Sequence, residues 1–105
     1  MMKRGEVHWI GLDPTVGTEI QKTRPCVVVS INPISKVRGS VVVVPVTSKG
    51  PERLPLVVEL SSAKSFAVCD QIRAVSKQRF GKPHSTLSTD DLATLDLNLK
   101  VVLGL

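Results

Sequence analysis

Aromatic residues are scarce in this chain. It has one Trp, two Phe and no Tyr, so aromatic residues make up only 3% of its 105 residues. Sheets that bind single-stranded nucleic acid in the manner of RNA-recognition motifs or OB-folds stack successive bases on exposed aromatic side chains. Three aromatic residues, some of them needed in the core, cannot cover a sheet in this way. Any nucleic-acid site must therefore depend on arginines, polar side chains and backbone groups.

Cysteines and long apolar runs are also few. Cys26 and Cys69 each sit in an apolar run without a nearby His or Cys at ligand spacing, which favours buried free thiols over a disulfide or a zinc site. No stretch approaches the roughly 20 apolar residues that cross a bilayer, and the N-terminal residues lack the apolar run of a signal peptide. We expect a cytoplasmic protein with no membrane partner, and nothing in the sequence calls for a cofactor.

Acidic residues are the minority among the charged ones. Lys and Arg number 14 against 9 Asp and Glu, which gives a formal net charge of +5. An excess of positive charge on a small domain favours polyanionic partners such as RNA or DNA. Many basic proteins bind no nucleic acid, however, so the charge accounts for attraction and not for chemistry.

Valine dominates the apolar residues that are present. It forms the runs 27–29 and 41–44, and its branching at Cβ suits strands better than helices. In these runs apolar residues occupy both the odd and the even positions of a strand, which indicates a sheet covered on both faces or bent into a barrel. A chain of 105 residues has room for one modest core, so we predict a single domain over residues 1–105.

The pattern of apolar and turn residues predicts five strands. The first two are separated by a loop over residues 13–24, which is longer than the usual connection of ~4–6 residues. Residues 32–39 are predicted to form a turn-rich connection, and His84 is placed in a turn rich in Pro and Ser. Pro45 is expected to break the third strand near its end. The predicted strands are Glu6–Leu12, Pro25–Ile31, Ser40–Val46, Leu56–Leu60 and Phe66–Val75.

The C-terminal segment is predicted to be one amphipathic helix. Ser88 is followed three residues later by Asp91, an acidic variant of the capping box. Apolar residues then recur at helical spacing, at Leu92, Leu95, Leu99 and Val102. Five strands and a terminal helix indicate a mainly β fold, with a small, strongly bent antiparallel sheet or a partly open barrel.

Four segments, in this order, resemble the pattern of the MazF/PemK toxin family. They are residues 4–7 with Trp9 shortly after, residues 13–25, residues 44–48 and residues 70–73; the closing residues 101–105 are also similar to the end of the family. The resemblance covers nearly the whole chain. It implies an SH3-like barrel of the CcdB/PemK type that forms homodimers. It also implies the toxin of a type II toxin–antitoxin system, an mRNA interferase that cleaves single-stranded RNA at short motifs without metal and is silenced by a MazE-like antitoxin with an acidic segment.

The same resemblance implies that Arg24 and Thr47 are the catalytic residues. RNA carries its own nucleophile, the 2′-hydroxyl, so the enzyme has to move protons and stabilise a pentacoordinate phosphorane. An arginine fork matches two phosphate oxygens and stays charged, and a threonine hydroxyl can donate a hydrogen bond to a third. The expected products are a 2′,3′-cyclic phosphate and a 5′-hydroxyl. Whether Arg24 also transfers a proton is left open.

Further residues are expected to contact the RNA. The amide of Gln71 offers both a donor and an acceptor and is a candidate reader of a base edge. The long loop is a candidate lid over the substrate. The other residues expected to line the substrate path are Glu19, Gln21, Lys22, Ser48, Lys49 and Arg73.

Other interpretations remain open at the level of sequence. Arg24 can be a solvated residue before a strand, and Thr47 a turn residue that caps the strand end through its hydroxyl. His8 and His84 raise the possibility of a two-histidine ribonuclease. A CcdB-like toxin that binds DNA gyrase without cutting RNA is the alternative function. An SH3-like interaction module is disfavoured, because such modules usually bind through aromatic grooves.

Overall fold

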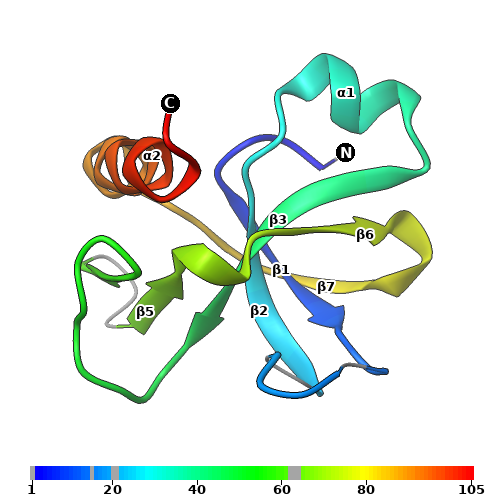
Figure 1. The fold of residues 1–105 in the computed structure, drawn as a ribbon. Helices are drawn as coiled ribbons and strands as arrows, with labels where there is room; N and C mark the ends of the chain where they lie inside the picture. The colour runs from blue at the N-terminus through cyan, green and yellow to red at the C-terminus, as the bar shows by residue number, and fades with distance from the viewer. Residues whose placement is uncertain (1, 15, 20–21, 62–64) are drawn as a thin grey trace.

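The computed structural model describes residues 2–14, 16–19, 22–61 and 65–105. Within them the chain forms a strongly bent antiparallel sheet and two α-helices (Figure 1). The strand order is β4-β5-β3-β2-β1-β7, and β6 pairs with β3 beside this path. The predicted mainly β fold with a C-terminal helix is confirmed. The strands are β1 (Glu6–Gly11), β2 (Thr23–Val28), β3 (Ser40–Thr47), β4 (Val57–Leu60), β5 (Ser65–Val68), β6 (Arg73–Ser76) and β7 (Phe80–Thr86); the helices are α1 (Asn32–Val37) and α2 (Thr89–Leu103).

Strand β3 changes partners along its length. Its first half pairs with β6, as far as Val43 opposite Arg73, and its last residues pair with β5, from Val46 opposite Ala67. Pro45 lies between these two ladders, where the missing N–H costs no bond to either, and it still pairs with β2. The expectation that Pro45 breaks the strand is therefore wrong. The change of partner makes β3 the strand about which the sheet bends.

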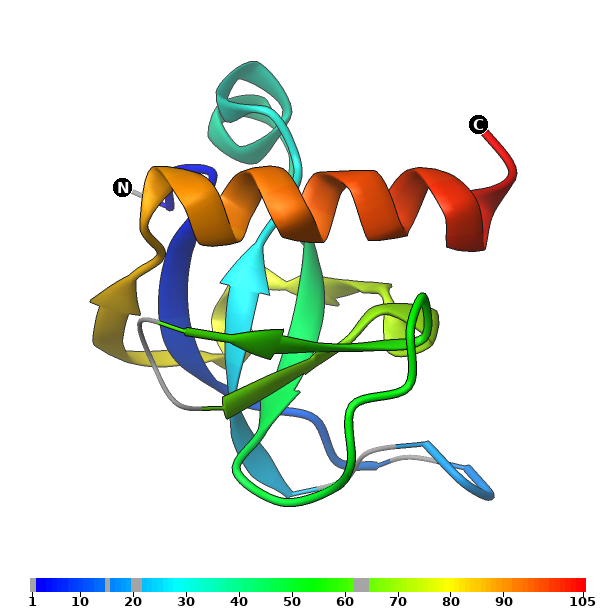
Figure 2. The same ribbon diagram turned by 90° about the vertical axis from the view of Figure 1, so that its left-hand side faces the viewer.

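Two core clusters lie on the two faces of the sheet. Val27 and Val44 belong to the first cluster, whereas their neighbours Val28 and Val43 belong to the second. This division confirms that the valine runs reflect a sheet buried on both faces. Leu95 and Leu99 of α2 complete the first cluster, and Figure 2 shows this helix lying across the strands.

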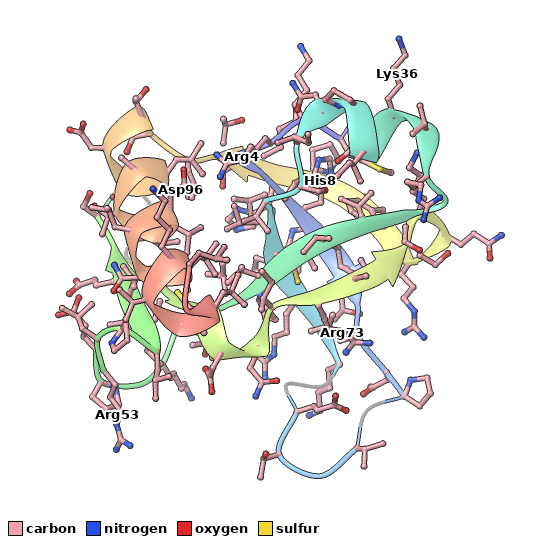
Figure 3. The ribbon with its side chains drawn as sticks, turned by 45° about the horizontal axis from the view of Figure 1, so that its top comes forward. Arg4, His8, Lys36, Arg53, Arg73 and Asp96 are labelled. Atoms are coloured by element: carbon pink, nitrogen blue, oxygen red, sulfur yellow. The ribbon has the colours of Figure 1, made fainter. Side chains whose placement is uncertain are left out.

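Helix α2 begins where the sequence predicts. The Ser88 hydroxyl accepts a hydrogen bond from the Asp91 amide at 3.1 Å, and Gly104 ends the helix with a φ of 72°. The Asp96 carboxylate on the helix pairs with the guanidinium of Arg4, which reaches it from the segment before β1 (Figure 3). The helix is thus anchored to the N-terminal segment as well as to the core.

Two predicted elements are wrong in type. Residues 32–39 contain helix α1, in which Pro33 occupies the first turn, a position that requires no N–H donor. The predicted fifth strand is divided by a 3₁₀ turn at Cys69–Gln71 (η1) into β5 and β6. The division has a physical reason, because β5 pairs with β4 and the end of β3, whereas β6 pairs with the start of β3.

Two further strand predictions need correction. The second strand begins at Thr23, so Pro25 is its third residue and not its first. Pro25 pairs with Trp9 of β1 and lies beyond the residues that pair with β3, which is why it is tolerated. Strand β7 was not predicted; it is an edge strand with an irregular register against β1, a position that accommodates Pro83. His84 therefore lies in a strand and not in a turn.

Both cysteines are buried free thiols, as predicted. Burial raises the pKa of Cys26 to about 12, against a smaller opposing effect of the Arg73 charge. Burial also raises the pKa of Cys69 to about 11, with the Asp70 charge acting in the same direction. Among the described helices, none is long and apolar enough to cross a membrane.

Candidate active site

Arg24 and Thr47 meet at one end of the sheet. The antiparallel register of β2 and β3 sets Cys26 opposite Pro45, Val27 opposite Val44 and Val28 opposite Val43. This ladder ends at Cys26 and Pro45, so Arg24 and Thr47 each lie two residues beyond its last pair. Arg24 pairs with Ile10 of β1, and Thr47 pairs with Phe66 of β5. Two residues 23 positions apart in sequence therefore lie at the same end of the sheet.

Arg24 and Thr47 also line one pocket, with a volume of about 240 Å³. The pocket lies between the β1–β2 strands and the β4–β5 hairpin, which crosses in front of the sheet in Figure 2. Its walls come from β1, β2, β3, β4, β5 and β7 and from Leu87. The other residues that line it are Val7, Trp9, Pro25, Val46, Ser48, Leu60, Ser65, His84, Ser85 and Leu87.

The Arg24 side chain carries an unused donor. Its Nε is buried and has no hydrogen-bond partner. A buried donor without a partner is costly, and such atoms are rare in folded proteins. The residue itself is half-buried at the start of β2, so the interpretation of Arg24 as a merely solvated residue is not what the structure shows. An anion placed at this end of the sheet would supply the missing acceptor.

The Thr47 hydroxyl is held by the turn that follows β3. It donates to the Lys49 carbonyl at 3.2 Å and lies 3.3 Å from the Lys49 amide, from which it accepts. Thr47 therefore caps the strand end, as the alternative interpretation proposed, and it also lines the pocket. Thr47 can donate to a substrate only by exchanging its bond to the Lys49 carbonyl for one to the substrate.

The other predicted contact residues divide into those near the pocket and those away from it. Ser48 lines it, and Lys49 is exposed immediately beyond. Gln71 on η1 and Arg73 on β6 do not line it. Gln71 was predicted to lie within the fifth strand and lies instead in the 3₁₀ turn.

The long loop holds the remaining predicted residues. Glu19 is exposed, and its carboxylate accepts the Val16 amide at 2.5 Å. Lys22 is exposed too, and its backbone has a left-handed φ of 69°. Its carbonyl accepts the Leu12 amide at 2.9 Å, which fixes the end of the loop. Gln21 lies outside the described residues.

Trp9 was not predicted as a site residue, and His84 was considered only as one of a pair of catalytic histidines, yet both line the pocket. Their ring centroids are 5.3 Å apart in an edge-to-face arrangement. His8 is absent from the pocket wall and instead contacts Glu6 at 3.1 Å. The structure therefore brings one histidine to Arg24 and Thr47, and a two-histidine mechanism at this pocket is not supported. Trp9 could have been recognised as a site residue through its pairing with Pro25, but only the strand register reveals that pairing.

Among the described residues, no group of three or more His, Cys, Asp and Glu side chains is placed to hold a metal ion.

Comparison with known proteins agrees with this geometry. Residues 3–103 match the family of PemK-like, MazF-like toxins of type II toxin–antitoxin systems. The chain belongs to the PemK/MazF toxin family. A curated relative, endoribonuclease MazF9 of Mycobacterium tuberculosis, is 37% identical over 116 residues, covering 100% of this chain and 98% of the relative.

Solved structures share the fold. The crystal structure of MazF from Deinococcus radiodurans superposes with a TM-score of 0.88 at 25% identity, covering 98% of this chain and 96% of that one. A mycobacterial endoribonuclease in complex with its cognate antitoxin superposes with a TM-score of 0.84 at 21% identity, covering 98% and 95%. The comparisons favour a MazF-type toxin over the CcdB-like alternative.

Proposed function

We propose that this chain is the toxin of a type II toxin–antitoxin pair and acts as a sequence-specific endoribonuclease on single-stranded RNA. The family match and the relative named as an endoribonuclease support the activity. The observation that supports the site is the presence of Arg24 and Thr47 in the wall of one pocket, at the same end of the β2–β3 pair. Messenger RNA is the substrate class that the family resemblance favours.

The proposed reaction uses the nucleophile that RNA itself carries. The 2′-hydroxyl oxygen attacks the adjacent phosphorus while its proton is removed, and the bond from phosphorus to the 5′-oxygen breaks as that oxygen gains a proton. The products are a 2′,3′-cyclic phosphate and a 5′-hydroxyl, and no metal is required. The Arg24 guanidinium stabilises the charge that develops on the phosphoryl oxygens, because arginine stays protonated in proteins and carries a buried, unpaired donor here. We assign it electrostatic stabilisation rather than proton removal.

Residues at and beyond the rim of the pocket would guide the flanking nucleotides. Ser48 and Lys49 follow Thr47 directly, so we assign them contacts with the phosphate next to the cleaved one. Charged side chains that contact the phosphate backbone hold RNA in place without reading its sequence. We propose the same role for Lys22 and Arg73, whereas Gln71 would read a base edge and Glu19 and Gln21 would line the rest of the substrate path.

We further propose that a MazE-like antitoxin inhibits the protein. MazF of Deinococcus radiodurans has been crystallised in MazE–MazF complexes, one of which superposes with a TM-score of 0.80 at 25% identity. A net charge of +5 suits an acidic, partly disordered segment that folds on binding. The two free thiols fit the reducing cytoplasm, where the RNA substrate is found.

We also propose a homodimer, and an apolar groove supports it. The groove runs between α1 and α2 and includes Ile34, Leu99, Leu103 and Leu105, three of which are exposed in the monomer. Exposed apolar surface of this kind commonly marks a protein interface.

The test is cleavage of RNA without divalent metal. Purified, antitoxin-free protein is incubated with a long unstructured RNA in EDTA, and the fragment ends are sequenced. Discrete cuts by the wild type, abolished in Arg24→Ala and reduced by roughly 10²–10³ in Thr47→Ala, are expected because each variant removes one group that stabilises the phosphorane. Thr47→Ser keeps the hydroxyl and should retain most activity, whereas the similarly shaped Thr47→Val should not. Intact RNA with correctly folded protein would reject the proposal, and gyrase binding would then be measured.

A further inference from the structure

Ser65 occupies a core-facing position at the start of β5. Burial alternates along this strand, so that Ser65 and Ala67 are buried and Phe66 and Val68 are half-buried. Across the hairpin, Ser65 pairs with Leu60, which belongs to the first core cluster. An apolar side chain would fit this position without further requirements. A serine there must find a partner for its hydroxyl or leave it unsatisfied.

The Ser65 hydroxyl has no partner. The residue is 8% exposed, and its Oγ is buried without a hydrogen bond. Two buried side-chain polar atoms in the described part of the chain lack partners, Ser65 Oγ and Arg24 Nε, and both residues line the same pocket. Ser30 provides the contrast. It is 7% exposed, yet its hydroxyl contacts the Ser35 hydroxyl at 2.8 Å and accepts from the Val42 amide at 3.2 Å.

The pocket is apolar around Ser65 and polar toward Arg24 and Thr47. Core residues of the first cluster form much of its wall, among them Leu60 and Leu87. A phosphate would lose hydration against such a wall without gaining hydrogen bonds. A nucleobase is flat and apolar on its faces and polar at its edge, and recognition of single-stranded RNA places splayed bases in such surroundings. The chemistry of the wall therefore fits a base better than a phosphate.

We propose that this pocket receives the base beside the cleaved phosphate, and that the Ser65 hydroxyl hydrogen-bonds to the edge of that base. This inference rests on the proposed nuclease function and adds a residue that determines specificity. Rotation about a single side-chain torsion re-aims a serine hydroxyl between its staggered positions, so the bound base can engage it. A base without a matching group leaves the hydroxyl buried and unpaired, which disfavours that base.

The experiment compares wild type, Ser65→Ala and Ser30→Ala on a randomised single-stranded RNA library in EDTA, with sequencing of the cut ends. We expect Ser65→Ala to keep cutting but to lose roughly 3- to 10-fold of the base preference at one position beside the cut, with the other positions unchanged. Ser30→Ala should cut with the wild-type pattern. Unchanged preference at every position in Ser65→Ala would overturn the inference while leaving the proposed nuclease intact. A wild type that leaves the library uncut would reject both.

Two further measurements distinguish base recognition by Ser65 from a purely structural role of this residue. Ser65→Ala should leave the melting temperature unchanged or raise it, because no internal hydrogen bond is lost, whereas Ser30→Ala should lower it. An equal drop in both variants would show that the Ser65 hydroxyl has a partner within the protein and would overturn the inference. The other candidate occupant is a side chain of an antitoxin. If Ser65→Ala weakened antitoxin binding and left the RNA pattern unchanged, the pocket would be assigned to the peptide instead.

Discussion

At the scale of single residues, the two buried thiols make the stability of the fold depend on pH in the alkaline range. An unfolded cysteine titrates near pH 9.0, whereas burial raises the pKa of Cys26 to about 12 and that of Cys69 to about 11. Between these values the unfolded chain has released protons that the folded protein still holds. Raising the pH therefore favours unfolding, by up to ~1.4 kcal/mol per pH unit for each thiol.

This dependence can be measured by urea denaturation at pH 8, 9.5 and 10.5. The free energy of unfolding should fall more steeply above pH 9 in the wild type than in Cys26→Ala, whose own loss of packing is the same at every pH. Cys69→Ala serves as the second comparison and should also flatten the curve. Identical pH profiles for all three proteins would contradict the prediction.

The residues of the candidate site differ in how far the sequence reveals them. Arg24 and Thr47 were identified through the family resemblance, and the antiparallel pairing of β2 with β3 brings them to the same end of the sheet, where they line one pocket. Ser65 and His84 carry no local signal, because what distinguishes them is the set of residues from other strands that surround them. Spacing along one chain does not report which strands will face each other across a pocket.

At the scale of elements, the N-terminal cap of α2 ties the helix to the sheet. The Ser88 hydroxyl accepts the Asp91 amide, and the Asp91 carboxylate accepts the Ser61 hydroxyl at 2.8 Å and the Ser61 amide at 3.2 Å. Ser61 directly follows β4. The capping pattern read from the sequence therefore also fixes where the helix begins relative to the β4–β5 hairpin.

Removing this cap should destabilise the fold without removing the active-site residues. Ser88→Ala is expected to cost ~1 kcal/mol, or roughly 4–8 °C in melting temperature for a domain of this size, because one amide of the first helical turn loses its acceptor. Ser88→Thr keeps the acceptor and should remain near the wild type. Differential scanning calorimetry measures both, and equal melting temperatures for Ser88→Ala and wild type would refute the cap assignment.

The elements that the sequence predicts correctly are those with a local pattern. Helix α2 has caps and a periodic apolar face, and β1, β3 and β4 have continuous or alternating apolar residues. Strand β7 lacks this pattern, because it is an edge strand that is largely exposed and contains a proline. The division into β5 and β6 was missed for another reason. Asp70 and Gln71 interrupt its apolar run, but no Gly or Pro marks a turn there, and the division follows from the change of pairing partner.

At the scale of the whole molecule, the net charge of +5 should make RNA binding depend on salt. Each neutralised phosphate of a single strand releases bound counterions and adds about −0.7 to the slope of log affinity against log salt. With three phosphates neutralised, affinity should fall roughly 20-fold between 50 and 200 mM salt. Trp9 is the sole tryptophan and lines the pocket, so its fluorescence provides a local probe of binding.

A 2′-O-methyl oligonucleotide is the suitable ligand, because it lacks the free nucleophile and cannot be cut. The same sequence with uncharged methylphosphonate linkages is the matched control and should bind with little dependence on salt. If Trp9 responds to both ligands and only the charged one is sensitive to salt, the base occupies the pocket while the phosphates meet the basic residues around it. A salt-independent affinity for the charged ligand would mean that apolar contacts in the pocket dominate, and the outer role proposed for Lys22, Lys49 and Arg73 would then be wrong.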